Sequence, residues 1–129
     1  MKKDLIELQK GVKAACVVIE DRDYINLENK VTMSANIDDV YLFGCKLENP
    51  IFKDKIEYLS NNGNLGYFII RQIDELSEKE QNKYISLVKD REFQGYKIPD
   101  NIIIVFTVQE KENLKKISKE LYHFCVIAF

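Results

Sequence analysis

The chain has 129 residues, 46% of them hydrophobic and 31% charged, and its net charge at pH 7 is −2. This length suits one domain with its own core, and the apolar share excludes a chain that is disordered throughout. The sequence lacks the basic surplus of a nucleic-acid-binding protein, and no run approaches the roughly 18 consecutive apolar residues of a membrane span. Its first residues lack the apolar core of a signal peptide, so we expect a cytoplasmic protein without nucleic-acid or membrane partners.

The three cysteines, Cys16, Cys45 and Cys125, are widely spaced and odd in number. Cys16 and Cys125 stand in apolar surroundings, where a cysteine acts as a small hydrophobic side chain. Neither a CxxC pair nor a suitably spaced histidine accompanies them, and a zinc site needs four such ligands. We therefore expect no metal site.

The N-terminal part of the chain predicts a helix followed by a strand. Apolar residues recur at helical spacing over 4–13, and the continuous apolar run 14–19 is typical of a strand covered on both faces. A single helix over 4–19 is an alternative, because its apolar residues also keep the helical period. An acidic, polar stretch over 20–30 separates this strand from a second one predicted over 31–35.

The middle of the chain predicts a helix, a strand and a second helix. Asn49-Pro50 marks a helix start, since asparagine can cap a helix and proline fits its first turn, and this helix ends at 61–63. The apolar run 66–70 predicts a short strand. A capping box over 77–80 then opens a helix with four inward-facing side chains, Gln81, Tyr84, Ile85 and Val88.

The C-terminal part predicts a turn region over 93–101, a strand over 102–106, a helix and a final strand over 125–129. The helix extends over 110–122 and buries three apolar side chains, Leu114, Ile117 and Leu121. Strands that alternate with helices indicate a mostly parallel sheet with helices on both faces. We therefore expect one three-layer α/β domain that spans 1–129.

In such a sheet, ligands bind at the carboxyl ends of the strands, so the residues after each strand are the candidates for a site. A phosphate-binding loop needs glycines and a lysine there, in the pattern GxxxxGK[ST], and the sequence contains no such pattern. The first strand instead leads into Glu20, Asp21 and Asp23, whose negative charge would repel phosphate. These residues argue against ordinary ATP binding.

Residues 66–109 contain an apolar strand, a polar helix that ends in Asp-Arg, a hairpin with the pattern Tyr-x-Ile-Pro-Asp, and an apolar strand that ends in Thr-x-Gln. In order and spacing, this stretch resembles the core of AAA+ ATPases of the MoxR-like kind. Residues 38–44 resemble the family's segment between its phosphate loop and its acidic strand, and 117–124 resemble its Ser-Pro-x-Leu-x-x-Arg-Phe motif. The resemblance implies a P-loop-NTPase-like sandwich.

The residues that this family uses for catalysis are replaced. Arg71 stands where the family has the Asp that holds Mg²⁺ through water, and Gln72 where it has the Glu that activates the attacking water. Gln109 replaces the sensor Asn, and His123 replaces the arginine at the subunit boundary. The phosphate loop is missing, and the chain ends where the family's helical lid would begin. Phosphoryl transfer depends on these groups, so the resemblance implies a degenerate nucleotide site with no catalytic residue and no cofactor.

Without the catalytic residues of the family, the function that the resemblance still implies is interaction with other proteins. We expect a non-catalytic AAA+-like domain that acts as a protein-interaction or regulatory module, with a protein partner such as an active AAA+ subunit. One alternative is an ATPase whose site for ATP and Mg²⁺ is completed by another chain. A second alternative is a receiver-like phospho-signalling domain, with Glu20, Asp21 and Asp74 as its acids and Thr107 after a central strand. Against the receiver, Arg71 stands where a receiver has an Asp.

Simpler structural roles are open for the same residues. Asp74 precedes the capping box and can favour the helix N-terminus electrostatically. Arg71 and Gln72 can be solvated or salt-bridged at a strand end, and His123 can be a packed or surface histidine. Thr107 can satisfy the backbone at the end of its own strand.

Overall fold

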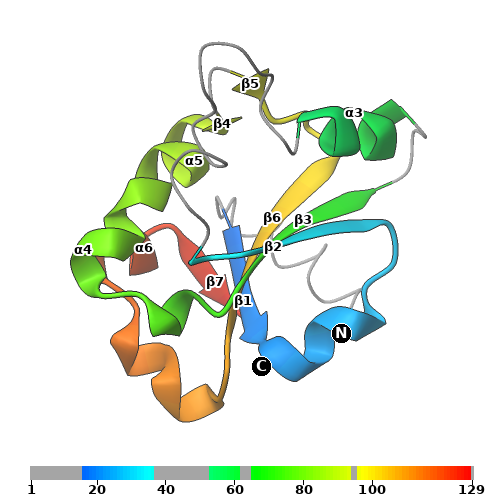
Figure 1. Cartoon of the computed structure of the whole chain (residues 1–129). Coiled ribbons are helices and arrows are strands. Elements are labelled where there is room, and N and C mark those ends of the chain that lie inside the picture. The colour runs from blue at the N-terminus through cyan, green and yellow to red at the C-terminus, as the bar shows by residue number, and fades with distance from the viewer. Residues whose placement is uncertain (1–15, 37–52, 62–64, 94–95, 129) are drawn as a thin grey trace.

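A computed structural model describes residues 16–36, 53–61, 65–93 and 96–128 of the chain. Its centre is an all-parallel sheet in the order β2-β3-β6-β1-β7 (Figure 1). The five strands are β1 (Cys16–Glu20), β2 (Lys30–Ser34), β3 (Gly66–Arg71), β6 (Ile102–Val108) and β7 (Cys125–Ile127). A parallel sheet with helices confirms the predicted α/β class.

The predicted strands agree with the observed ones to within one or two residues at most ends. The alternative of one helix over 4–19 is wrong, because residues 16–20 form β1, with both neighbouring strands hydrogen-bonded to it. A continuous apolar run without polar positions suits a strand that is buried on both faces, and this favours the strand over an amphipathic helix. The predicted helix over 4–13 and the cysteine at position 45 lie outside the described residues.

In the described part of the chain between β2 and β6, the structure has two helical regions. The first is α3 (Lys53–Asn61), whose predicted start at Asn49-Pro50 and whose end at 62–63 lie outside the described residues. The second combines η2 (Ile73–Glu75), α4 (Glu78–Gln81), η3 (Asn82–Tyr84) and α5 (Ile85–Asp90). The predicted capping box is present, since the Ser77 hydroxyl accepts from the Glu80 N–H and the Glu80 carboxylate accepts from the Ser77 N–H, both at 3.2 Å.

The prediction of one helix over 110–122 is wrong. The structure has a 3-10 helix, η4 (Lys111–Lys116), and a short helix, α6 (Lys119–Tyr122). Ile117 between them is extended and Ser118 is also not helical, because the Ser118 N–H donates to the side chain of Gln81 instead of to a helical carbonyl. The three predicted apolar residues of this segment still reach the core.

Short elements complete the described fold. A 3-10 helix, η1 (Asp21–Asn26), follows β1 directly. The hairpin predicted within 93–101 is present as the antiparallel strands β4 (Glu92–Phe93) and β5 (Tyr96–Lys97), with its turn at 94–95 outside the described residues. In the described part of the chain, no helix has the length and apolar character needed to cross a membrane.

The two faces of the sheet bury separate hydrophobic clusters. All the described α-helices that reach the core pack on one face, through Ile56 of α3, Leu87 and Val88 of α5, and Leu121 of α6. The opposite face packs against Leu27 and, from η1, Tyr24. The prediction of helices on both faces is therefore confirmed only in part. Within the described residues, α-helices cover one face and a 3-10 helix packs on the other.

Cys16 and Cys125 lie side by side on the neighbouring strands β1 and β7. Their Sγ atoms are 3.2 Å apart, and both residues are free thiols. The hydrogen bond with Cys125 and the burial of Cys16 raise the pKa of the Cys16 thiol well above its ordinary value. The prediction that these cysteines sit in apolar surroundings is confirmed for Cys16, which is fully buried.

Because the thiolate is the reactive form, we expect Cys16 to be alkylated by iodoacetamide at pH 8 at least about tenfold more slowly in the folded protein than in urea. Peptide mapping by mass spectrometry after timed quenching measures the rate at each cysteine. Equal rates for Cys16 in the folded and the unfolded chain would contradict its burial beside Cys125.

Candidate functional site

Three adjacent strands present polar side chains at their carboxyl ends. The strand β6 lies between β1 and β3, so the ends of all three form one edge of the sheet. In register, Ile19 pairs with Thr107 and Ile70 with Phe106, which places Arg71 beside Thr107. Asp21 follows β1 at the same edge. The sequence predicted this location for a site, and the structure brings four of the candidate residues together there: Asp21, Arg71, Gln72 and Thr107.

The carboxylate of Asp21 is the centre of this group. Arg71 donates to it from two nitrogens, Nε to Oδ1 at 3.0 Å and Nη2 to Oδ2 at 2.8 Å. The hydroxyl of Thr107 donates to Oδ1 at 2.7 Å, and the amide of Gln72 reaches Oδ2 at 3.4 Å. Paired contacts from a guanidinium fix the geometry of a carboxylate more firmly than a single contact does. We call these four residues the strand-end network.

The electrostatics of the network favour a charged pair. Burial raises the pKa of the Asp21 carboxyl, but hydrogen bonds from Arg71, Thr107 and Gln72 and the charge of Arg71 outweigh it, so the pKa is lowered. The hydrogen bond to Asp21 raises the pKa of Arg71 in turn. The Arg71 guanidinium also lies over the ring of Tyr24, 4.2 Å from the ring centre, and makes a cation–π contact with it. Both charges are thus partnered within the protein.

Gln72 has an unusual backbone conformation. Its φ of 62° and ψ of 50° lie in the left-handed region, which costs a residue with a side chain about 1 kcal/mol. In this conformation its N–H donates to the Thr107 hydroxyl at 2.8 Å. The Thr107 hydroxyl therefore accepts one hydrogen bond and donates another, and it links the ends of β3 and β6 to Asp21.

A second polar group lies beside the network, around Asp74 of η2. The Asp74 carboxylate accepts from the Gln109 N–H at 3.3 Å and from the Asn113 amide at 2.8 Å. The Gln109 side chain donates to Glu75 at 3.3 Å. Asp74 is only 7% exposed, so these bonds replace its contact with water. They tie η2 to the end of β6 and to η4.

His123 lies away from these two groups. It caps the C-terminal end of α6, and its side chain lines a pocket of about 650 Å³. The other walls of this pocket come from η4 and α6, including Leu114 and Tyr122, and not from the strand ends. Of the four candidate positions, Arg71 and Gln72 share one network, Gln109 joins the neighbouring group, and His123 joins neither.

Two simple interpretations from the sequence are corrected by these contacts. Asp74 does not act through the helix N-terminus alone, because its carboxylate is bonded to the end of β6 and to η4. Thr107 satisfies the backbone of Gln72 and the carboxylate of Asp21, not the backbone of its own strand. Sequence reasoning missed Tyr24 and Asn113, since nothing in their local sequence indicates partners so far along the chain.

The strand-end arrangement offers little reactive capacity. The two oxygens of Asp21 are engaged by three side chains, and the guanidinium of Arg71 is held by the same carboxylate. Among the described residues, no cluster of three histidine, cysteine, aspartate or glutamate side chains could hold a metal ion. The arrangement is suited to joining three strand ends rigidly.

No protein-family model matches the sequence, and no curated protein is significantly similar to it.

Proposed function

We propose that this chain is a non-catalytic, AAA+-like domain that acts as a protein-interaction or regulatory module, with an active AAA+ subunit as the kind of partner expected. The observation that carries the proposal is the salt bridge between Arg71 and Asp21 across the end of β6. It places a guanidinium, itself bound to a carboxylate, at the edge of the sheet where a nucleotide's phosphates and Mg²⁺ would have to bind.

The order of the strands bears on the receiver-like alternative. Counted along the chain, the strands of the sheet are first to fifth, and the first, β1, lies between the fourth, β6, and the fifth, β7. A receiver-like sheet has the order 2-1-3-4-5, with the first strand beside the second and third, so the strand order counts against that alternative. Fold alone does not define function, so the residues must carry the argument.

The residues support a domain without phosphoryl transfer. Such catalysis needs a cradle for the phosphates, Mg²⁺ to neutralise charge, and a group that orients the attacking water. At the end of β1, the 3-10 helix η1 begins with Asp21, and the described connection to β2 holds no glycine. Arg71 cannot ligate Mg²⁺, and Gln72 cannot act as a base. Each of these differences from the ATPase family removes a separate requirement of phosphoryl transfer.

The test is thermal unfolding of the purified chain with and without ATP and Mg²⁺. We expect no change in Tm, whereas a ligand present at a hundred times its Kd would stabilise the fold by about 2.7 kcal/mol, a shift of several degrees. Two samples serve as controls, one with ADP in place of ATP and one with Mg²⁺ and no nucleotide. A reproducible rise in Tm with ATP would contradict the proposal, because it would mean that this chain by itself still binds the nucleotide.

A further inference from the structure

Two free thiols, Cys16 and Cys125, meet within the sheet although 109 positions separate them along the chain. They are register partners on the parallel strands β1 and β7, and their Sγ atoms are 3.2 Å apart (Figure 1). Neighbouring strands lie about 4.8 Å apart, which falls within the range of about 4.4–6.8 Å between the Cα atoms of a disulfide. The two strands therefore already stand at a separation that a disulfide can bridge.

The two cysteines differ in their access to solvent. Cys16 is fully buried, and its hydrogen bond with Cys125 together with this burial raises the pKa of its thiol. Cys125 is partly exposed, as are the other two residues of β7. Among the described strands, β7 pairs with β1 alone and so forms an edge. A reagent in water therefore reaches Cys125 first, with the Cys16 sulfur in contact with it.

The two carbonyls that accept the thiol protons each have a second donor. The Cys125 thiol donates to the Leu121 carbonyl at 3.3 Å, and the Cys16 thiol donates to the Phe124 carbonyl at 3.4 Å. The Leu121 carbonyl also accepts from the Phe124 N–H at 3.0 Å, and the Phe124 carbonyl from the Cys16 N–H at 3.2 Å. Loss of the thiol protons therefore avoids the cost of a buried acceptor without a partner.

We propose that Cys16 and Cys125 form a redox-active dithiol, which a hydroperoxide converts to a disulfide and a thiol reductant restores. The bond would join the edge strand β7 covalently to β1. A disulfide with a partly exposed cysteine belongs to the labile, regulatory class and not to the structural class that resists reduction. This redox site goes beyond the proposed interaction role and does not depend on it.

The reaction balances with hydrogen peroxide as the oxidant. The Cys125 thiolate attacks one peroxide oxygen, so that an S–O bond forms, the O–O bond breaks and the leaving hydroxide takes up a proton as water. Cys125 is thereby oxidised by two electrons to a sulfenic acid, and the peroxide is reduced by the same two. The Cys16 sulfur then attacks the sulfenic sulfur. The S–S bond forms as the S–O bond breaks, and the hydroxide leaves with the Cys16 proton as a second water.

The test is treatment of the folded full chain with a slight molar excess of hydrogen peroxide, followed by quenching with N-ethylmaleimide and peptide mapping by mass spectrometry. We expect a linked pair of peptides that contains Cys16 and Cys125, and the return of both thiols with dithiothreitol. A disulfide that closes so long a loop should raise the Tm by at least about 5 °C. Cys45→Ser is the matched control, because it keeps both members of the pair and should form the same link.

Two variants, each made in the Cys45→Ser chain, separate the roles of the two thiols. In Cys16→Ala, the sulfenic acid of Cys125 has no second thiol to react with, so dimedone should trap it at least about tenfold more than in the Cys45→Ser chain. In Cys125→Ala, the remaining thiol is buried, so Cys16 should react with peroxide at least about tenfold more slowly than Cys125 does. If Cys16→Ala does not fold, the link mapped in the unmodified chain still decides.

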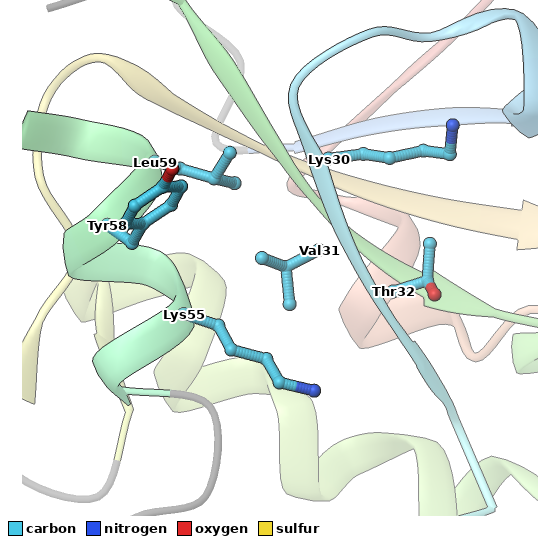
Figure 2. A pocket seen from close by; sticks show the side chains of 6 residues that line it. All are labelled: Lys30, Val31, Thr32, Lys55, Tyr58 and Leu59. Atoms are coloured by element: carbon cyan, nitrogen blue, oxygen red, sulfur yellow. The ribbon is translucent and has the colours of Figure 1, made fainter. Parts of the chain in front are cut away.

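Hydrogen exchange measures whether the bond fixes the edge strand. The Ala128 N–H donates to the Val18 carbonyl at 2.8 Å, and oxidation should slow the exchange of this amide and of the β7 amides at least about threefold. The strand β2 at the opposite edge of the described sheet is the internal reference. It lines a pocket of about 550 Å³ together with α3 (Figure 2), and its amides that exchange by local opening should be unchanged by oxidation.

Three results would overturn the redox pair. These are links that map to Cys45 or between two chains in place of the link from Cys16 to Cys125, dimedone labelling of Cys125 that is equal with and without Cys16, and formation of the link only after urea has unfolded the chain. A fall in Tm on oxidation would also count against it, because the bond would then disrupt the sheet that it is expected to fix.

Discussion

Replacement of Gln81 by leucine is expected to lower the free energy of unfolding by about 3 kcal/mol, since a buried group without its partner costs roughly 1–3 kcal/mol. Gln81 is fully buried at the end of α4. Its amide donates to the carbonyl of Leu76 at 3.0 Å and to that of Lys116 at 2.8 Å, and its carbonyl accepts from the Ser118 N–H at 2.7 Å. Leucine has a similar volume but offers none of these bonds.

Urea unfolding followed by circular dichroism measures this change. Lys79→Gln is the matched control, because Lys79 is an exposed residue of the same helix and its replacement should change the stability by less than about 0.5 kcal/mol. A loss below about 1 kcal/mol in Gln81→Leu would mean that water or a local shift satisfies the freed backbone groups. The three bonds would then not hold the connection between η4 and α6.

That connection also shows where sequence reasoning stops. The central strands β1, β3 and β6 were predictable because a continuous apolar run is typical of a strand in a sheet covered on both faces. The capping box was predictable because its two residues lie three positions apart. The break at Ile117 and Ser118 was not, since the bond that causes it comes from Gln81, 37 residues away. Gln81 itself was recognised as an inward-facing residue, but its partners depend on how the helices pack.

The strand-end network follows the same pattern. Its location was predictable, because ligand sites and polar side chains gather at the carboxyl ends of parallel strands. The pairing of Arg71 with Asp21 was not, since it depends on β6 lying between β1 and β3. The left-handed backbone of Gln72 was also not predictable, because this conformation usually selects glycine or asparagine. Local sequence therefore identified the candidate positions, and the strand order determined which of them meet.

The second expected result concerns this network. Asp21→Asn should lower the free energy of unfolding at pH 7 by about 2 kcal/mol, the worth of a hydrogen bond to a charged group, because Arg71 loses its anionic partner. The pKa of Asp21 is lowered in the folded protein from its usual 3.8, so the carboxylate stabilises the fold above that value. This stabilisation is lost as the pH falls through the lowered pKa, where the folded protein also takes up the proton.

The measurement is urea unfolding of both proteins between pH 7 and pH 3. The difference should be constant down to about pH 4 and should then shrink. Asp23→Asn makes the same change of charge within η1 but outside the network, and it separates a loss of net charge from a loss of the pair. A difference that does not change with pH would mean that Asp21 stabilises the fold by shape alone.

The double variant Asp21→Asn, Arg71→Met decides between two accounts of the pair. If Asp21→Asn is destabilising because it leaves a guanidinium without its partner, removing that guanidinium should restore part of the lost stability. If the network is needed to align the ends of β1, β3 and β6, the double variant should be no more stable than Asp21→Asn, because the single variant has already lost the link between the strands. A gain on adding Arg71→Met would show that the salt bridge fills the strand ends without being required to assemble them.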